Sequence, residues 1–476
     1  MTRRIAWLSL VAFGLLVATF FLKTTGVHFD ASSYLRIAYR EPLGDSAATA
    51  KPWLFYVLNY TLFNSVGSLL GRFRPLSLDL CYMAASAIGL AWAAVRLNSE
   101  DSRLDALLRI SLVTASALTL VSGTVLMMEA AALPAMTVAL VCAATGASTR
   151  TSRVALVASS AFATAIKATT MPGLVLIALG FWARSRRQAV LIAAGVAAGL
   201  LVNAIGLRMI GPHGAINYGR IDDLWSMRLI AERLARTGPY VTLWVAFVGV
   251  TLAVVALASP RRVFQDRALR ILAPGSLAAV FFVQLVSRYD FARYCYPAMW
   301  VALLWITLTA DVKKRALVAS LLVVELTMAA PMFMRTTDRF RFWPELVRRE
   351  MIDSSGTVFP GTRINGLVAR QLVRDPQPCV WINSENGERN ELLKQFARLM
   401  FPASKTHVSP VFDPAHDPAC TWATTIRMWR EHVESPAAGC TDSCAPCQFQ
   451  KMEYFFLKPG WVRNQVCFPL ADGRRP

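Results

Sequence analysis

Long apolar runs, separated by clusters of Arg or Lys, make up most of this sequence. A helix needs about 20 apolar residues to cross a bilayer, and basic residues collect in the loops that stay in the cytoplasm. The chain is 55% hydrophobic and only 17% charged. Soluble domains are about 45–50% apolar and about 25% charged. Because a soluble fold cannot bury this much apolar surface, we expect an all-α polytopic membrane protein.

The apolar runs predict eleven transmembrane helices. They lie at residues 5–22, 78–96, 108–127, 131–147, 154–166, 171–183, 189–210, 239–258, 269–287, 295–310 and 316–333. Arg3 and Arg4 precede the first run, and Lys23 follows it without a small-residue cleavage site, which favours a retained signal anchor with a cytoplasmic N-terminus. Each short loop on the cytoplasmic side then holds Arg or Lys, and residues 335–476 lie outside the cytoplasm.

The formal net charge of +20 would attract any polyanion. Here the Arg clusters lie between apolar runs, so they indicate topology rather than nucleic-acid binding. We therefore expect membrane lipids, and no nucleic acid, among the partners.

Two apolar segments allow more than one interpretation. Residues 154–182 could form one long helix or two short ones, and Lys167 with Pro172 in the middle favours a re-entrant break. Counting residues 52–71 as a span would place every later Arg cluster outside, so we expect a helix lying along the outer surface. Residues 23–77 then form a long first extracytoplasmic loop.

The polar C-terminal part differs from the rest in its cysteines. Six of the nine cysteines crowd it, at positions 379, 420, 440, 444, 447 and 467, which suggests disulfides in an oxidising compartment. The spacing from Cys440 to Cys447 could also bind an iron–sulfur cluster, but such clusters suit reducing compartments. With the strand-like run 378–382, this part predicts a small mixed α/β domain over 335–476 beside a transmembrane module over 1–334.

The outer loops hold ionisable residues next to the bilayer. The first loop contains Asp30, Tyr34, Arg40, Glu41 and Lys51. A lone Asp after a helix is more often a solvated loop residue than a catalytic one, so a catalytic Asp30 depends on what stands near it.

More ionisable residues follow at the outer ends of later spans. Glu129 stands within about forty otherwise apolar residues, where a charge is a functional hypothesis by default. The alternative is that Glu129 only pairs with a buried base such as Lys167. Arg288 and Arg293, beside Tyr294, could hold a lipid phosphate through their guanidinium forks, or could simply lie at the interface as snorkelling side chains.

Taken in order, these residues resemble the GT-C glycosyltransferases, especially relatives of the dolichyl-phosphate-mannose protein mannosyltransferases and the bacterial lipid A aminoarabinose transferase. The resemblance covers about residues 5–310. It consists of Asp30, the Lys-Pro-Trp-Leu-Phe-Tyr segment from Lys51 ending in Gly67 or Gly71, Glu129 at the start of the fourth span, the segment 165–170 around Lys167, and Arg293-Tyr294 followed by Pro297. Asp30 is followed by Ala31 where many members have a second acid, so the resemblance leaves a divalent cation and the acceptor open.

The resemblance implies a GT-C-like fold and the transfer of a sugar from a polyprenyl-phosphate donor to a glycan, lipid or protein acceptor on the extracytoplasmic face. Asp30 would accept the proton of the acceptor hydroxyl, with Glu129 as a second catalytic carboxylate, while Lys51, Arg288 or Arg293 would stabilise the leaving phosphate. The other residues expected to bind substrate are Tyr34, Arg40, Glu41, Lys167 and Tyr294. The cell compartment implied is a bacterial inner membrane, with the C-terminal domain in the periplasm.

Two other functions stay open from the residues. A transporter or lipid flippase could line its path with Glu129 and Lys167, although transporters commonly show internal repeats and helices broken near the midplane. A membrane-anchored scaffold would leave the charges of the outer loops unexplained. The residues at one membrane face favour the enzyme.

Overall fold

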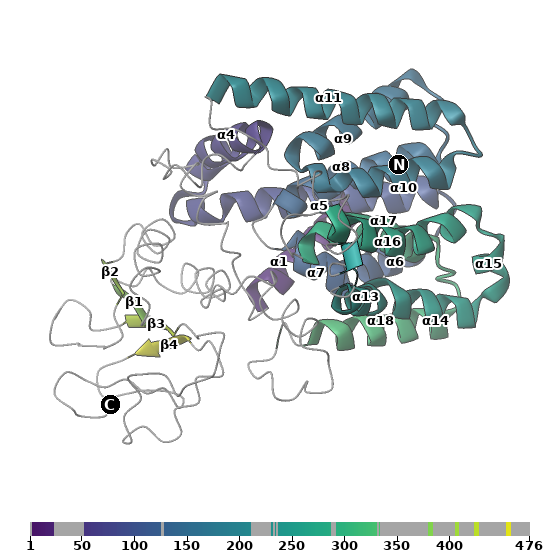
Figure 1. Cartoon of the computed structure of the whole chain (residues 1–476). Coiled ribbons are helices and arrows are strands. Elements are labelled where there is room, and N and C mark those ends of the chain that lie inside the picture. Colours follow the sequence, from purple (N-terminus) through teal and green to yellow (C-terminus); the bar gives the residue numbers. More distant parts are fainter. Residues whose placement is uncertain are drawn as a thin grey trace.

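The computed structural model describes residues 2–22, 52–124, 128–210, 230–231, 234, 237–286, 292–330 and 333, together with four strands nearer the C-terminus. The helices are α1 (Thr2–Leu22), α4 (Trp53–Leu69), α5 (Ser77–Leu97), α6 (Arg103–Ala115), α7 (Ala117–Gly123), α8 (Met128–Ala144), α9 (Arg150–Ile166), α10 (Met171–Phe181), α11 (Arg186–Ile210), α13 (Gly238–Trp244), α14 (Val250–Ala258), α15 (Pro260–Gln265), α16 (Arg267–Val286), α17 (Tyr296–Thr309) and α18 (Arg315–Ala329). They form a bundle, with the four strands to one side of it (Figure 1).

Five described helices are long and apolar enough to cross a membrane, and there are six candidates if the bent pair α6 and α7 counts as one. The five are Thr2–Phe20, Ser77–Leu97, Arg186–Gly206, Tyr240–Ala258 and Arg267–Leu285. Helices also occupy the other predicted segments, but most of them are shorter, so the count of eleven crossings stays a prediction. At this coarser level the prediction is confirmed, because the described bundle is helical and contains five or six helices that could cross a membrane.

The burial of these helices fits a lipid surround. Only 28% of the most apolar stretch of α11 is buried, whereas 67% of that of α5 is buried. Apolar side chains such as Leu201 on α11 therefore point outward, which in water would leave an aggregation-prone surface. In a bilayer they face acyl chains, while α5 lies inside the bundle.

Close packing between α9 and α11 depends on two glycines spaced four residues apart. A Cβ added at Gly199 would lie 2.4 Å from the carbonyl oxygen of Ala161, and one at Gly195 would lie 2.6 Å from the Cβ of Ser160. Small residues at this spacing let two helix backbones approach each other, which is how helices commonly associate in membranes. Any larger side chain at Gly199 would push α11 away from α9.

The predicted single helix over 108–127 is wrong in one respect, because the structure breaks it into α6 and α7 with a bend of 65°. Ser116 adopts an extended conformation at the break, and its side chain accepts a hydrogen bond from the Thr119 N–H. The buried Glu325 carboxylate accepts the N–H of Ala117 at 3.2 Å and the hydroxyl of Thr251 at 2.5 Å. These acceptors satisfy N–H groups that a bend in an apolar surround would otherwise leave unpaired.

The break predicted within residues 154–182 is confirmed. Lys167 is extended, with φ −157° and ψ 116°, and it ends α9. A 3₁₀ turn, η2 (Ala168–Thr170), follows, and α10 begins with Pro172 in its first turn, where the missing N–H of proline does no harm. The segment therefore forms two helices that meet at Lys167.

Helix α4 covers most of the segment predicted to lie along the outer surface. It has 17 residues and is not among the described helices long enough to cross a membrane. Its buried residues include Phe55 and Asn59, and the amide oxygen of Asn59 accepts the hydroxyl of Tyr82 on α5. The structure thus attaches α4 to the bundle, and its orientation along the membrane stays a prediction.

The strands form one mixed sheet in the order β2-β1-β3-β4. They are β1 (Cys379–Asn383), β2 (Lys405–Val408), β3 (Ala423–Arg427) and β4 (Tyr454–Leu457). Strand β1 pairs in parallel with β2 and β3, and β4 pairs antiparallel with β3. The strand expected at 378–382 is confirmed, whereas the cysteine pairing falls outside the described side chains.

Basic side chains from α6 and from two loops hydrogen-bond the ends of helices at one end of the bundle, which we name the basic-loop end. Arg109 donates to the carbonyl of Leu308 at 2.8 Å, near the end of α17. Lys314 donates to the carbonyl of Ala258 at 2.8 Å, at the end of α14, and Arg184 donates to the last carbonyl of α8. Cations at helix C-termini are favourable. The loops that the sequence placed on one side of the membrane therefore lie together.

Candidate functional site

Four of the predicted site residues, from three separate segments, come together in the structure, and we name them the Glu129 cluster: Glu129, Lys167, Arg293 and Tyr294. The Nζ of Lys167 donates to Oε1 of Glu129 in a buried ion pair. The same Nζ lies 5.1 Å from the centroid of the Tyr294 ring, and the Cζ of Arg293 lies 5.6 Å from it. Both distances are within the range of cation–π attraction.

Local structure explains where the two members of the ion pair stand. Glu129 is in the first turn of α8, where the helix dipole favours a carboxylate. Lys167 directly follows α9, and its N–H donates to the carbonyl of Ala163 at 2.9 Å. The C-terminus of α9 favours a cation for the same reason. The extended backbone of Lys167 then leads the chain into η2 and α10.

A close approach between α10 and α17 brings Lys167 near Tyr294. A Cβ at Gly173 would lie 2.5 Å from the Cε of Met136 and 3.0 Å from the carbonyl oxygen of Pro297. Only glycine allows α10 to pass this close to the first turn of α17. Arg293 and Tyr294 lie just before that turn, in the 3₁₀ turn η5 (Ala292–Cys295).

The cluster holds two cations and one carboxylate among the residues that the structure describes. Glu129, Lys167 and Arg293 are all buried, and Tyr294 is partly buried. The second carboxylate oxygen of Glu129 has no hydrogen-bond partner in the described part of the chain. A buried site with two cations can bind an anion such as a phosphate, since guanidinium and ammonium groups both form charge-assisted hydrogen bonds to its oxygens.

The Glu129 cluster lies at the opposite end of the bundle from the basic-loop end. Helix α8 starts beside Glu129 and ends where Arg184 donates to its last carbonyl. Likewise, α17 starts after Arg293 and ends where Arg109 binds its final turn. The four residues of the Glu129 cluster therefore lie at one end of the bundle, and their place at one membrane face stays a prediction.

The other predicted site residues fall outside the described residues. These are Asp30, Tyr34, Arg40, Glu41, Lys51 and Arg288. Within the described residues, no group of three or more His, Cys, Asp or Glu side chains is placed to hold a metal ion.

The buried acid Glu325 is a further candidate that was not predicted from the sequence. It lies on α18 and contacts the bend between α6 and α7 through Ala117, as well as Thr251 on α14. The signal was available, because Glu325 is the single acidic residue of the run 316–333. The physical reasoning that singled out Glu129 applies equally to this position.

Comparison with known proteins adds nothing to this geometry. No protein-family model matches the chain, and no curated protein matches it in sequence.

Proposed function

We propose that the chain is a membrane glycosyltransferase that moves a sugar from a polyprenyl-phosphate donor to an acceptor at the membrane face of the Glu129 cluster. The observation that supports this best is that two buried cations, Lys167 and Arg293, both lie near the Tyr294 ring at the ends of apolar helices. A lipid-linked phosphate would reach such a site from the headgroup region while its polyprenyl chain stays among the helices.

The proposed reaction is an inverting displacement at the anomeric carbon of the donor sugar. The acceptor oxygen forms a bond to this carbon, the bond from the carbon to the phosphate oxygen breaks, and the electron pair leaves on the polyprenyl phosphate. Asp30 takes the proton of the acceptor hydroxyl. Arg293, with Lys51 and Arg288, stabilises the charge that develops on the leaving phosphate.

Within this proposal Glu129 holds Lys167 in place, and its second oxygen is available to the acceptor or to a divalent cation. The proposal includes eleven crossings of a bacterial inner membrane, a mixed α/β domain over 335–476 on the extracytoplasmic side, and a glycan, lipid or protein as acceptor.

The test is the release of free polyprenyl phosphate from labelled sugar carriers by the purified protein in bicelles. Release that depends on an acceptor supports the transferase. We expect Arg293→Gln to raise the donor KM about tenfold or more, because a charge-assisted hydrogen bond contributes about 1.5–3 kcal/mol. Arg187→Gln, an exposed arginine at the basic-loop end, is the matched control and should leave KM unchanged.

Two results would contradict the proposal. One is the absence of polyprenyl phosphate release across a panel of carriers by well-folded protein. The other is movement of intact carrier across reconstituted vesicles without release, which would establish the flippase instead.

A further inference from the structure

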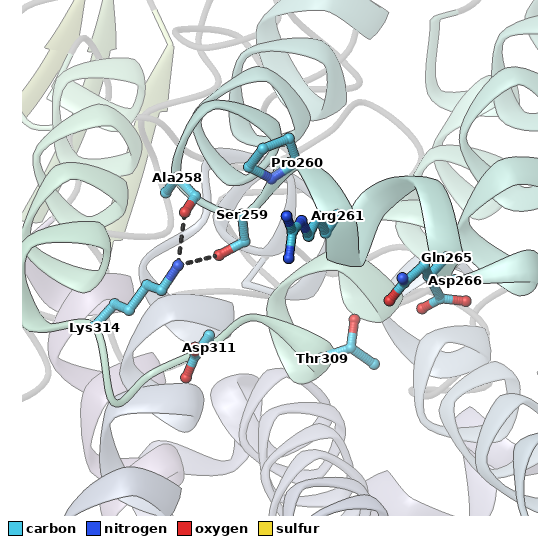
Figure 2. Close-up of a pocket in the computed structure, with 9 residues that line it drawn as sticks. All are labelled: Ala258, Ser259, Pro260, Arg261, Gln265, Asp266, Thr309, Asp311 and Lys314. Carbon is cyan, nitrogen blue, oxygen red and sulfur yellow. Dashed lines mark hydrogen bonds between the residues drawn. The ribbon is translucent and has the colours of Figure 1, made fainter.

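A pocket of about 670 Å³ opens at the basic-loop end (Figure 2). The Glu129 cluster is at the other end of the bundle. The pocket lies between the end of α14, the short helix α15, the start of α16 and the loop from α17 to α18. Its lining residues are Ala258, Ser259, Pro260, Arg261, Gln265, Asp266, Thr309, Asp311 and Lys314. The proposed transferase reaction makes no use of it.

Two of the four charged side chains in the lining already have protein partners. The Nζ of Lys314 donates to the Ala258 carbonyl at 2.8 Å and to the Ser259 hydroxyl at 3.0 Å. Asp266 accepts the Nε1–H of Trp305 at 2.9 Å, and its other oxygen accepts the N–H of Leu269 at 3.1 Å. These contacts link the walls of the pocket, and each of the two groups already forms two hydrogen bonds within the protein.

The other two charges, Arg261 and Asp311, form no hydrogen bond or ion pair with any described residue. Figure 2 shows them on different walls of the pocket, with the Arg261 guanidinium extending from α15 and Asp311 on the loop after α17. A guanidinium and a carboxylate that line one pocket without pairing can both be satisfied by a molecule that carries an anion and a cation.

The position of the pocket fits a membrane lipid. Two candidate spans meet there, since Tyr240–Ala258 ends and Arg267–Leu285 begins at its walls. The apolar side chains of Leu257 and Phe264 are 85% and 71% exposed beside it. A polar pocket at headgroup depth with bare apolar side chains next to it can hold a headgroup while the acyl chains follow the helices.

We infer that this pocket binds the headgroup of a phospholipid that carries both a phosphate and a primary ammonium group, as in phosphatidylethanolamine. Arg261 donates to the phosphate oxygens, and Lys314 adds its remaining N–H. Asp311 accepts hydrogen bonds from the ammonium. A quaternary ammonium has no N–H to donate, and a glycerol headgroup has no positive charge, so the site distinguishes phosphatidylethanolamine from phosphatidylcholine and from phosphatidylglycerol.

The experiment measures dissociation constants of the delipidated full chain by native mass spectrometry, with these three lipids carrying identical acyl chains. We expect phosphatidylethanolamine to bind about tenfold more tightly than phosphatidylcholine, which corresponds to about 1.4 kcal/mol. Arg261→Gln should weaken phosphatidylethanolamine and phosphatidylglycerol alike. Asp311→Asn should weaken phosphatidylethanolamine selectively.

Matched controls remove the same charges at exposed positions of the basic-loop end. Arg186→Gln is paired with the arginine variant, and Glu100→Gln with the aspartate variant. All four positions lie outside the core, so each protein should elute as the wild type does. Equal affinity for the three lipids, or controls that behave like the pocket variants, would overturn the inference.

A soluble competitor shows whether the pocket binds a membrane lipid or a free headgroup. Glycerophosphoethanolamine at millimolar concentration should leave the lipid complex intact. If it displaces the lipid at a concentration similar to that of the lipid, the pocket binds a free headgroup and the assignment to a membrane lipid is wrong.

Discussion

Removing one partner of the Glu129–Lys167 ion pair should destabilise the fold far more than removing both. The side chains of Lys167 and Glu129 are only 5% and 1% exposed, so neither can recover its hydration when the other is lost. A buried charge left without its partner costs about 3–5 kcal/mol, whereas replacing a whole buried pair by uncharged residues is often neutral. We therefore expect Lys167→Met to lose about 3–5 kcal/mol, because Glu129 then keeps no hydrogen-bond partner among the described residues, and the double variant with Glu129→Gln to lose about 1 kcal/mol or less.

The measurement is equilibrium unfolding of the protein in bicelles, with all four members of the double-mutant cycle. The pair formed by Arg315 and Asp105 is the matched control, with a separation of 3.0 Å and a 53% exposed arginine. The Asp105 side chain is only 8% exposed, but it keeps the hydroxyl and the N–H of Ser102 as donors, at 2.7 and 3.3 Å. Because Asp105 stays hydrogen-bonded and the pair reaches solvent through the arginine, Arg315→Gln should cost about 1 kcal/mol or less. A Lys167→Met variant within about 0.5 kcal/mol of the wild type, or a double variant as unstable as the sum of the singles, would refute the reasoning.

Three further outcomes are expected. Asp30→Asn should lower kcat by about 10²–10⁴ while donor binding and folding are retained, since the amide cannot accept a proton; near-normal turnover would remove Asp30 from the role of base. Cysteine-accessibility labelling should reach sites near residues 40 and 350 from outside and sites near 151 and 186 from the cytoplasm, and labelling of 151 and 350 from one side would break the predicted topology. The six C-terminal cysteines should be mostly paired, so alkylation without reductant followed by mass spectrometry should modify few of them; six free thiols or stoichiometric iron would contradict the pairing.

The positions of the helices could be predicted because the signals are local. Runs of apolar residues and the basic residues that close them lie next to each other in the chain, and the break at Lys167 and Pro172 is encoded by those two residues themselves. The bend at Ser116 could not be predicted in this way. Its acceptor, Glu325, lies 208 residues beyond Ala117 in sequence, so only the folded chain brings them together.

The candidate site could be predicted only in part for the same reason. Glu129 and Lys167 stood out because a charge among apolar residues needs a partner, and pairing of the two was one of the alternatives. The stacking of Lys167 on Tyr294 depends on the close approach at Gly173, which no local pattern signals. The phospholipid pocket was missed because its opposite charges, Arg261 and Asp311, lie in the short charged segments between predicted spans, and such segments were interpreted only as topology signals.

The contacts of α18 with α6 and α7 affect the order in which the chain folds during synthesis. Arg315 binds Asp105 in the first turn of α6, and Glu325 accepts the N–H of Ala117, the first residue of α7. Because α18 is the last described helix to leave the ribosome, about two hundred more residues must be synthesised after Ala117 before its N–H can reach this acceptor. An unpaired N–H in hydrocarbon costs several kcal/mol. The bend therefore reaches its final form only when α18 joins the bundle, and nascent chains stalled before residue 325 should remain open to membrane quality-control proteases.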